Sequence, residues 1–254
     1  VLLFILGWIV QGNLLKFDSE QFQIFSNTLQ AIAVGYFFSC ISYIHLTKKW
    51  RYFVFVSCLI SYALLLSVTN VPGLGQSELL PDQNLALYID RFVFGKFDDG
   101  TQYTWLLSGF GFTATTLSGI FAGELIKSKH PRKKVAMYLM IYGIIGLTIG
   151  LIWGIWHPIV KKIWTSSFVL ASSGICYLLL AFFYWVIDVK GKIKWAFPLK
   201  VIGSNAITAY VLSHVFNFPK IANYLLFGLE KYLGAYYEVI NTIGGFGLLY
   251  LLLW

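Results

Sequence analysis

The side chains best suited to chemistry are polar groups inside long apolar segments. Asn27 and Gln30 open one such segment, and Asn205 and His214 lie in another. A polar side chain at membrane depth is costly, so each of these residues is a candidate for a functional role. For Asn27 and Gln30 two interpretations stay open: they cap a helix, or they line a polar cavity.

His214 is the histidine that we consider as a catalytic group. It shares a helix face with Tyr210, one turn earlier, and would lie toward the outer end of its segment. An isolated histidine inside a membrane segment is more often a hydrogen-bonded structural residue, and that alternative stays open. His157 is followed by Pro158 and is interpreted as part of a turn.

A third group of candidates begins the apolar segment that follows residue 164. Trp164, Ser166 and Ser167 stand where the free N–H groups and the positive dipole end of a helix would stabilise a developing negative charge. Tryptophan and lysine are also ordinary anchors at a membrane interface. Both interpretations fit the sequence.

A basic cluster lies between two apolar segments and contains Lys127, Lys129, Lys133 and Lys134. Its density is sufficient to contact phosphate groups, which would make it the cofactor-binding part of a site. The alternative is a topology determinant beside anionic lipid headgroups.

Acidic and sulfur-containing side chains give weaker signals. Asp90 and the pair Asp98 and Asp99 could do acid–base work, although charged residues in a water-exposed link are expected in any case. Cysteines lie at three positions in apolar segments, without metal-ligand spacing, and are expected to be packed as small apolar residues: Cys40, Cys58 and Cys176. No metal site is predicted.

The composition identifies the kind of molecule that must position these groups. Of 254 residues, 58% are hydrophobic and 12% are charged, and the mean hydropathy is +0.71. Soluble domains carry about 25% charged residues, so this chain has too few to coat a water-facing surface. A soluble enzyme, a disordered chain and a disulfide-rich secreted module are excluded, and an integral membrane protein is predicted.

Long unbroken apolar runs predict an all-α fold, a polytopic transmembrane bundle of about eight helices forming one domain over residues 1–254. The expected segments are 1–12, 24–46, 52–71, 104–126, 135–154, 165–187, 199–217 and 237–254. Both ends lie inside apolar runs, so we expect the chain to be truncated at both ends.

Glycines at four-residue spacing predict close packing between helices. One pair is Gly119 and Gly123, and a second series is Gly146, Gly150 and Gly154. Aromatic and glycine-rich faces exceed those that one bundle needs, which suggests a homo-oligomer.

The distribution of lysine and arginine predicts the orientation. The links 47–51, 127–134 and 188–200 carry 12 of the 19 basic residues and are expected on the cytoplasmic side. The link 72–103 is then a long extracytoplasmic loop. The net charge of +8 therefore reflects membrane topology, and no nucleic-acid partner is expected.

Five short motifs in order resemble the bacterial membrane proteins related to heparan-α-glucosaminide N-acetyltransferase, in particular an uncharacterised subgroup common in Bacteroides-like bacteria. The motifs are Leu29-Gln-Ala-Ile-Ala-Val-Gly-Tyr36, Tyr103-Thr-Trp105 with Gly119-Ile-Phe-Ala-Gly123, Lys161-Lys-Ile-Trp-Thr-Ser-Ser167, Tyr184-Trp-Val-Ile-Asp188 and Gly203-Ser-Asn-Ala-Ile-Thr-Ala-Tyr210.

The resemblance implies a transmembrane enzyme of the bacterial inner membrane that takes an acetyl group from cytoplasmic acetyl-CoA. The acceptor would be an amino sugar or glycan on the extracytoplasmic side. The resemblance adds Trp105 to the substrate-positioning residues, and it places the catalytic histidine in a loop upstream of Val1. The human-type relatives carry Arg-Ile-Pro-Gly-Val-Leu-Gln where this chain has Ile24-Phe-Ser-Asn-Thr-Leu-Gln30, and the family's helix near His214 often carries glutamate.

The leading hypothesis is therefore an acetyltransferase in which Asn205, Trp164, Ser166 and Ser167 position the thioester and stabilise its oxyanion. Two rivals remain. One is a non-enzymatic transporter or flippase for a lipid-linked sugar, which would use the same polar midplane residues. The other is a membrane scaffold whose polar residues serve packing alone.

Overall fold

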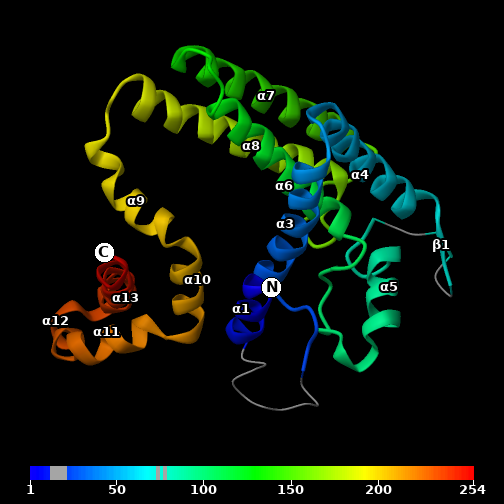
Figure 1. Cartoon of the computed structure of the whole chain (residues 1–254). Helices are drawn as coiled ribbons and strands as arrows, with labels where there is room; N and C mark the ends of the chain where they lie inside the picture. The colour runs from blue at the N-terminus through cyan, green and yellow to red at the C-terminus, as the bar shows by residue number, and fades with distance from the viewer. Residues whose placement is uncertain (12–21, 73–74, 77–78) are drawn as a thin grey trace. The chain divides into compact units, whose positions relative to one another are not determined.

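A computed structural model describes residues 1–11, 22–72, 75–76 and 79–254, and 76% of the chain is helical. The chain forms two compact units (Figure 1). The first contains residues 1–7 and 19–191, and the second contains residues 8–18 and 192–254. The all-α class predicted from the apolar runs is confirmed.

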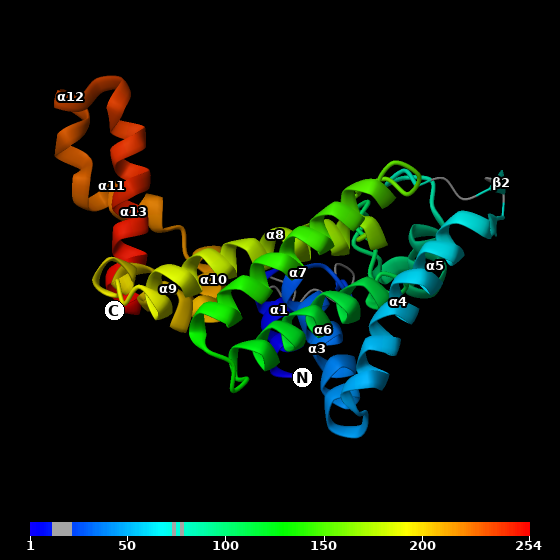
Figure 2. The same ribbon diagram turned by 90° about the horizontal axis from the view of Figure 1, so that it is seen from above.

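The first unit is built mainly on five long helices. They are α3 (Thr28–His45), α4 (Lys48–Val68), α6 (Gly109–Ile126), α7 (Arg132–Trp153) and α8 (Ser166–Tyr184). Residues 2–7 of the short helix α1 (Leu2–Val10) also belong to this unit, and a π-helical turn, Trp185–Val189, extends α8. In both ribbon views α7 and α8 run side by side along most of their length (Figure 2).

Glycines allow α7 and α8 to approach closely. A Cβ on Gly143 would lie 3.0 Å from the carbonyl oxygen of Gly174, and one on Gly150 would meet the backbone of Ala171. The predicted packing role of the second glycine series is therefore confirmed at Gly150. The predicted role of Gly119 and Gly123 is wrong, because a Cβ at either position meets no described atom within 4 Å.

The link 72–103 is partly folded. Where the link begins, two strands of two residues each form a small antiparallel hairpin, β1 (Asn70–Val71) with β2 (Gly75–Gln76). Helix α5 (Leu85–Phe94) follows, with Asn84 capping it through a 2.8 Å bond from the Leu87 N–H. The α5 residues Leu85 and Ala86 join Tyr62 and Leu66 of α4 in one buried cluster.

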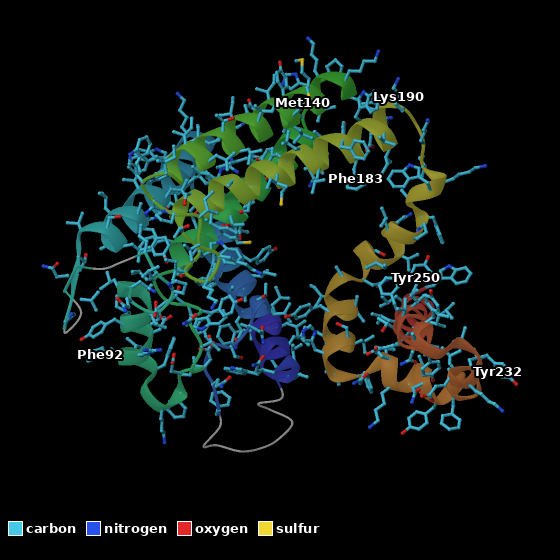
Figure 3. The ribbon with its side chains drawn as sticks, turned by 180° about the vertical axis from the view of Figure 1, so that it is seen from behind. Phe92, Met140, Phe183, Lys190, Tyr232 and Tyr250 are labelled. Atoms are coloured by element: carbon cyan, nitrogen blue, oxygen red, sulfur yellow. The ribbon has the colours of Figure 1, made fainter. Side chains whose placement is uncertain are left out.

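The second unit contains a series of shorter helices. They are α9 (Phe197–Ser204), α10 (Ala206–Val215), α11 (Phe218–Leu226), α12 (Glu230–Leu233) and α13 (Tyr237–Leu253). Helix α11 packs against α13, since a Cβ on Gly245 would lie 2.7 Å from the Pro219 nitrogen. Tyr232 and Tyr250 project outward from this unit (Figure 3).

Four helical stretches among the described residues are long and apolar enough to cross a membrane: Lys48–Val68, Arg132–Trp153, Ser166–Val189 and Phe218–Leu253. The chain therefore has the helices of an integral membrane protein, but the expected eight-helix bundle is not supported.

The missing spans have local causes. Helices α3 and α6 are each 18 residues long, and polar residues such as Gln30, Thr113 and Glu124 lower their hydropathy. The segment 199–217 is interrupted at Asn205, which ends α9 and precedes α10. The helix α1 has nine residues and falls short of a full span. The expected segment 237–254 is supported, because α13 belongs to the stretch Phe218–Leu253.

Candidate functional site

The main candidate site is a cavity of about 840 Å³ between α4, α6, α7 and α8 in the first unit. Its volume falls in the range of small-molecule sites. Along α7 the lining runs from Tyr138 to Ile149, which corresponds to about 17 Å of helix. The cavity is therefore elongated along the helices, with one end beside the link between α6 and α7.

That end of the cavity is polar and carries charged side chains. It is lined by Lys48 from the start of α4, Glu124 from the end of α6, and Ser128 and His130 from the link. The ring of His130 stands edge-on to Tyr138, with centroids 5.5 Å apart.

Glu124 organises the charges at this end. It forms an ion pair with Arg51, and the ammonium of Lys48 lies 3.9 Å from its second carboxylate oxygen. The Arg51 guanidinium also lies 4.6 Å from the centroid of the Tyr43 ring. Two cations share one carboxylate, so the cluster keeps a net positive charge.

The four predicted phosphate-binding lysines lie at the same end of the unit, on the link and the first turn of α7, and all four are exposed. Lys133 and Lys134 lie on different faces of α7, because successive residues of a helix point in different directions. Lys134 stands one and two turns before the cavity residues Tyr138 and Tyr142 on the same face of α7. Lys133 instead lines a different, smaller cavity between α7 and α8.

Hydroxyl groups line the interior of the large cavity. The Ser118 hydroxyl donates to the Ser173 oxygen at 3.1 Å, and the Tyr177 hydroxyl donates to the Ser118 carbonyl at 2.7 Å. These groups join α6 to α8 across the cavity wall. They offer hydrogen bonds to a polar chain lying along an otherwise aromatic and aliphatic surface.

Asn27 and Gln30 cap α3. The Asn27 side chain accepts the Leu29 N–H at 3.0 Å, and Gln30 Oε1 accepts the Ser26 N–H at 2.7 Å. The Gln30 amide donates to the Ile24 carbonyl at 2.9 Å, and Asn27 donates to the Gly7 carbonyl. Of the two interpretations left open by the sequence, the structure places both side chains in capping.

Trp164, Ser166 and Ser167 donate to protein acceptors. The Trp164 indole N–H donates to Thr115 Oγ1 at 3.0 Å, Ser166 donates to the Leu59 carbonyl at 2.7 Å, and Ser167 donates to the Pro158 carbonyl at 3.1 Å. Trp164 has a positive φ of 49°. Its ring and carbonyl lie 2.8 Å from where a Gly111 Cβ would be, so only glycine fits beneath it.

Trp105 is held by two acidic residues. Its backbone N–H donates to Asp90 at 2.6 Å, and its indole N–H donates to Asp99 at 3.2 Å. Its ring stacks on Phe25 with centroids 5.8 Å apart. Trp105 therefore fixes the link 72–103 to the start of α3.

Asp90 is fully buried on α5 and also accepts the Leu106 N–H at 3.0 Å. Burial raises the pKa of Asp90 to about 7, and the two N–H donors oppose that shift. Burial likewise raises the pKa of Asp99, against its bonds from Thr101. Asp90 thus titrates near neutral pH at a fixed position in the fold.

His157 is buried between α7 and α8, with 3% of its surface exposed. Within the described part of the chain, neither of its ring nitrogens has a hydrogen-bond partner. Burial lowers the pKa of His157, so the neutral ring is favoured. Its ring centroid lies 5.9 Å from that of Trp153, at the end of α7.

Asn205 and His214 belong to the second unit. The Asn205 amide donates to the carbonyls of Val201 and Leu253 at 3.1 and 3.2 Å, which ties α9 to the end of α13. His214 is exposed, its Nδ1 lies 2.8 Å from the Tyr210 carbonyl, and its ring lies 4.3 Å from the Tyr210 ring. Both residues make local structural contacts.

Comparison with known proteins gives no assignment. No protein-family model and no curated protein matches the chain. The chemistry of the site must therefore be inferred from its own residues. Across the described residues, no group of three or more histidine, cysteine, aspartate or glutamate side chains could hold a metal ion.

Sequence reasoning missed the cavity and the charge cluster at its end. The cavity walls come from α4, α6, α7 and α8, which lie far apart along the chain, so no local residue spacing reveals the cavity. One signal was present: Glu124 is the one charged residue of its helix, and such a residue at membrane depth is expected to have a partner and a role. The partner is Arg51, at the start of α4.

Proposed function

We propose that the chain is a membrane acyltransferase that takes an acetyl group from acetyl-CoA and passes it to a sugar or glycan. The observation that carries the proposal is the elongated cavity with a cationic end and hydroxyl groups along its wall. Coenzyme A has the matching form, since phosphates lie at one end and a long, weakly polar arm ends in the thioester.

The phosphates would lie at the charged end. Lys48 lines the cavity, Lys134 stands one turn before the cavity residue Tyr138 on α7, and Lys127 and Lys129 belong to the adjoining link. Ammonium groups bind phosphate as point charges and tolerate several geometries, which suits the flexible side chains of an exposed link.

The pantetheine arm would run along α7 and α8. The Ser118 and Tyr177 hydroxyls donate to protein acceptors, and their oxygens, with that of Ser173, can accept hydrogen bonds from the amide N–H groups of the arm. The neighbouring aromatic rings cover its methylene groups. Because the donors of Trp164, Ser166 and Ser167 already serve protein acceptors, we assign these residues to the scaffold of the site. The family resemblance implies a histidine as the acid–base group.

Transfer of labelled acetyl tests the proposal. Membranes containing the full protein would be incubated with radiolabelled acetyl-CoA and an amino sugar, and acetylated sugar would be counted. We expect transfer, and we expect Ser173→Phe to abolish it by filling the cavity. Ile175→Phe is the matched control, because Ile175 lies two residues away on α8 and is exposed.

Two results would contradict the proposal. One is transfer that survives Ser173→Phe in a folded protein, since the acetyl donor would then lie elsewhere. The other is no transfer and no acetyl-CoA binding by the folded wild-type protein, which would leave the transporter hypothesis ahead.

A further inference from the structure

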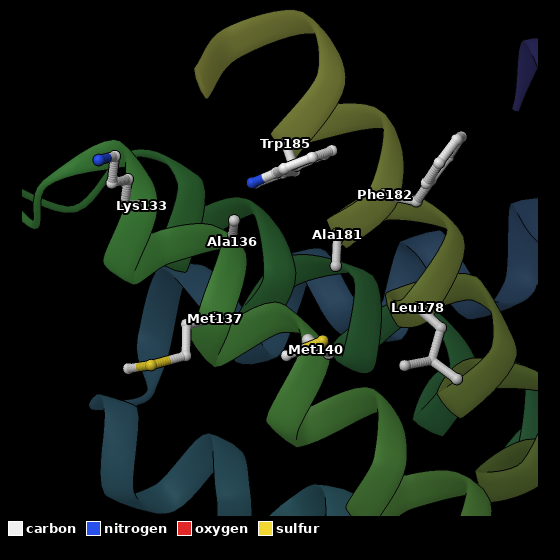
Figure 4. Close-up of a pocket in the computed structure, with 8 residues that line it drawn as sticks. All are labelled: Lys133, Ala136, Met137, Met140, Leu178, Ala181, Phe182 and Trp185. Atoms are coloured by element: carbon white, nitrogen blue, oxygen red, sulfur yellow. The ribbon is translucent and has the colours of Figure 1, made fainter. Parts of the chain in front are cut away.

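A second cavity of about 460 Å³ lies between α7 and the end of α8 (Figure 4). Its lining consists of Lys133, Ala136, Met137, Met140, Leu178, Ala181, Phe182 and Trp185. The two alanines are buried, and they form the floor of the groove because their side chains are too short to fill it. The larger apolar side chains stand at its sides.

The groove opens on the apolar surface of the unit. Met140 and Phe182 are 47% and 55% exposed, and both belong to helices long and apolar enough to cross a membrane. Apolar side chains exposed on such helices face lipid chains rather than water. An occupant of this groove must therefore be apolar over most of its length.

One end of the groove carries positive charge. Lys133 belongs to the lining, and Figure 4 shows the indole nitrogen of Trp185 turned toward the side of α7 where Lys133 lies. The ammonium of Lys190 lies 4.9 Å from the centroid of the Trp185 ring. Figure 3 shows Lys190 and Met140 at the same end of the α7–α8 pair.

Arg132 is a third cation at this end, and it contacts the backbone of Asp188. Asp188 is the acidic residue of the turn Trp185–Val189 that ends α8. The Arg132 guanidinium donates to the Asp188 carbonyl at 3.0 Å, which joins the start of α7 to the end of α8. The Asp188 side chain is exposed. Three cations against one carboxylate leave a net positive charge beside an apolar groove.

We propose that this groove, defined by the eight lining residues above, is a binding site for one anionic phospholipid. An acyl chain lies over Ala136 and Ala181, and the phosphate of the headgroup lies against Lys133 and the Trp185 indole N–H. Charge complementarity favours this occupant. A neutral lipid would leave the cations without an anionic partner, and a free phosphate would leave the apolar groove unfilled. The site is independent of the proposed acetyl-CoA cavity.

Native mass spectrometry of the full protein in detergent tests the proposal. The probes are phosphatidylglycerol, phosphatidylcholine with the same acyl chains, and glycerol 3-phosphate, which has the phosphate but no chain. We expect phosphatidylglycerol to bind more tightly than phosphatidylcholine. A basic residue near a lipid surface contributes about fivefold in affinity, so Lys133→Ala should weaken phosphatidylglycerol binding by about that factor.

Two matched controls separate the groove from general lipid contact. Lys134→Ala removes the neighbouring lysine on a different face of α7 and should leave the affinity unchanged. Met140→Gln places an amide in the groove and should weaken binding, whereas Ile144→Gln, at a residue one turn later with similar exposure (51%), should not.

Three outcomes would overturn the proposal. Equal binding of the two phospholipids would remove the charge selectivity. Equal loss in Lys133→Ala and Lys134→Ala would indicate diffuse attraction to the basic link. Tight binding of glycerol 3-phosphate, unaffected by Met140→Gln, would indicate a phosphate site without a lipid chain.

Discussion

Asp90 joins α5 to the Trp105 segment through a carboxylate that has no access to water. It accepts the N–H groups of Trp105 and Leu106, and burial is the larger effect, which raises the pKa of Asp90 to about 7. A carboxyl whose pKa is higher in the folded state than in the unfolded state holds its proton longer when folded. The stability that the protonated group contributes is therefore lost as the pH rises through the folded pKa.

We predict that the contribution of Asp90 to the midpoint of thermal unfolding in detergent decreases as the pH rises from about 4 to about 7, and that Asp90→Asn removes this contribution. The amide keeps one acceptor oxygen but loses the other, so the variant should be less stable at acid pH by about 1 kcal/mol. An unchanged pH profile in Asp90→Asn would contradict the role given to the carboxyl.

His157 predicts the opposite pH dependence. Burial lowers its pKa, so the unfolded chain takes up a proton below about pH 6.5 while the folded chain resists it. Stability should fall as the pH drops through that region. His157→Phe keeps a ring and removes two polar atoms that lack partners among the described residues.

The His157→Phe variant should therefore unfold at a higher temperature than the wild type at pH 5, with a smaller difference at pH 8. Thermal unfolding of both proteins at the two pH values measures this. A variant less stable at both pH values would show that the imidazole has a polar partner in the folded protein.

Among the elements, the α7–α8 pair bears both cavities, and its close approach depends on glycine. A Cβ on Gly150 meets the backbone of Ala171, and one on Gly174 meets the backbone of Leu147. Backbone cannot move aside as a flexible side chain can, so a methyl group there must separate the helices. Both cavities are lined from these two helices and would change shape with them.

Gly150→Ala should destabilise the protein by about 1–3 kcal/mol, a typical cost of overpacking. Gly119→Ala is the matched control, because a Cβ there meets no described atom and alanine favours a helix by up to about 1 kcal/mol. Thermal unfolding of the two variants gives the comparison. Equal effects would show that α7 and α8 are not held together at Gly150.

For the whole molecule, the sequence predicts the membrane class and the helix positions better than the number of spans. The apolar runs place a helix in each expected segment. The hydrophobicity of a run does not show where its helix is interrupted, as at Asn205. Gln30 and Glu124 lower the hydropathy of α3 and α6, and their hydrogen-bond and ion-pair partners are fixed only by folding. The count of four therefore needed the structure.

The candidate site was predicted in part, for a similar reason. The basic link could be found from its lysine density, but the division between Lys133 and Lys134 follows from which helix face meets α8. Polar residues at helix starts, such as Asn27 and Ser166, were predicted to be candidate site residues because they lie in apolar segments. Their acceptors, the Gly7 and Leu59 carbonyls, lie on other helices and are visible only in the fold.

The most direct test of the account is acetyl-CoA binding to the full protein in detergent, measured by calorimetry for the wild type, Lys134→Ala and Lys133→Ala. We predict that the wild type binds and that Lys134→Ala weakens binding, because Lys134 lies on the face of α7 that lines the large cavity. Lys133→Ala should bind like the wild type, because Lys133 lines the other cavity. Absence of binding by a folded wild-type protein, or a loss confined to Lys133→Ala, would contradict the account.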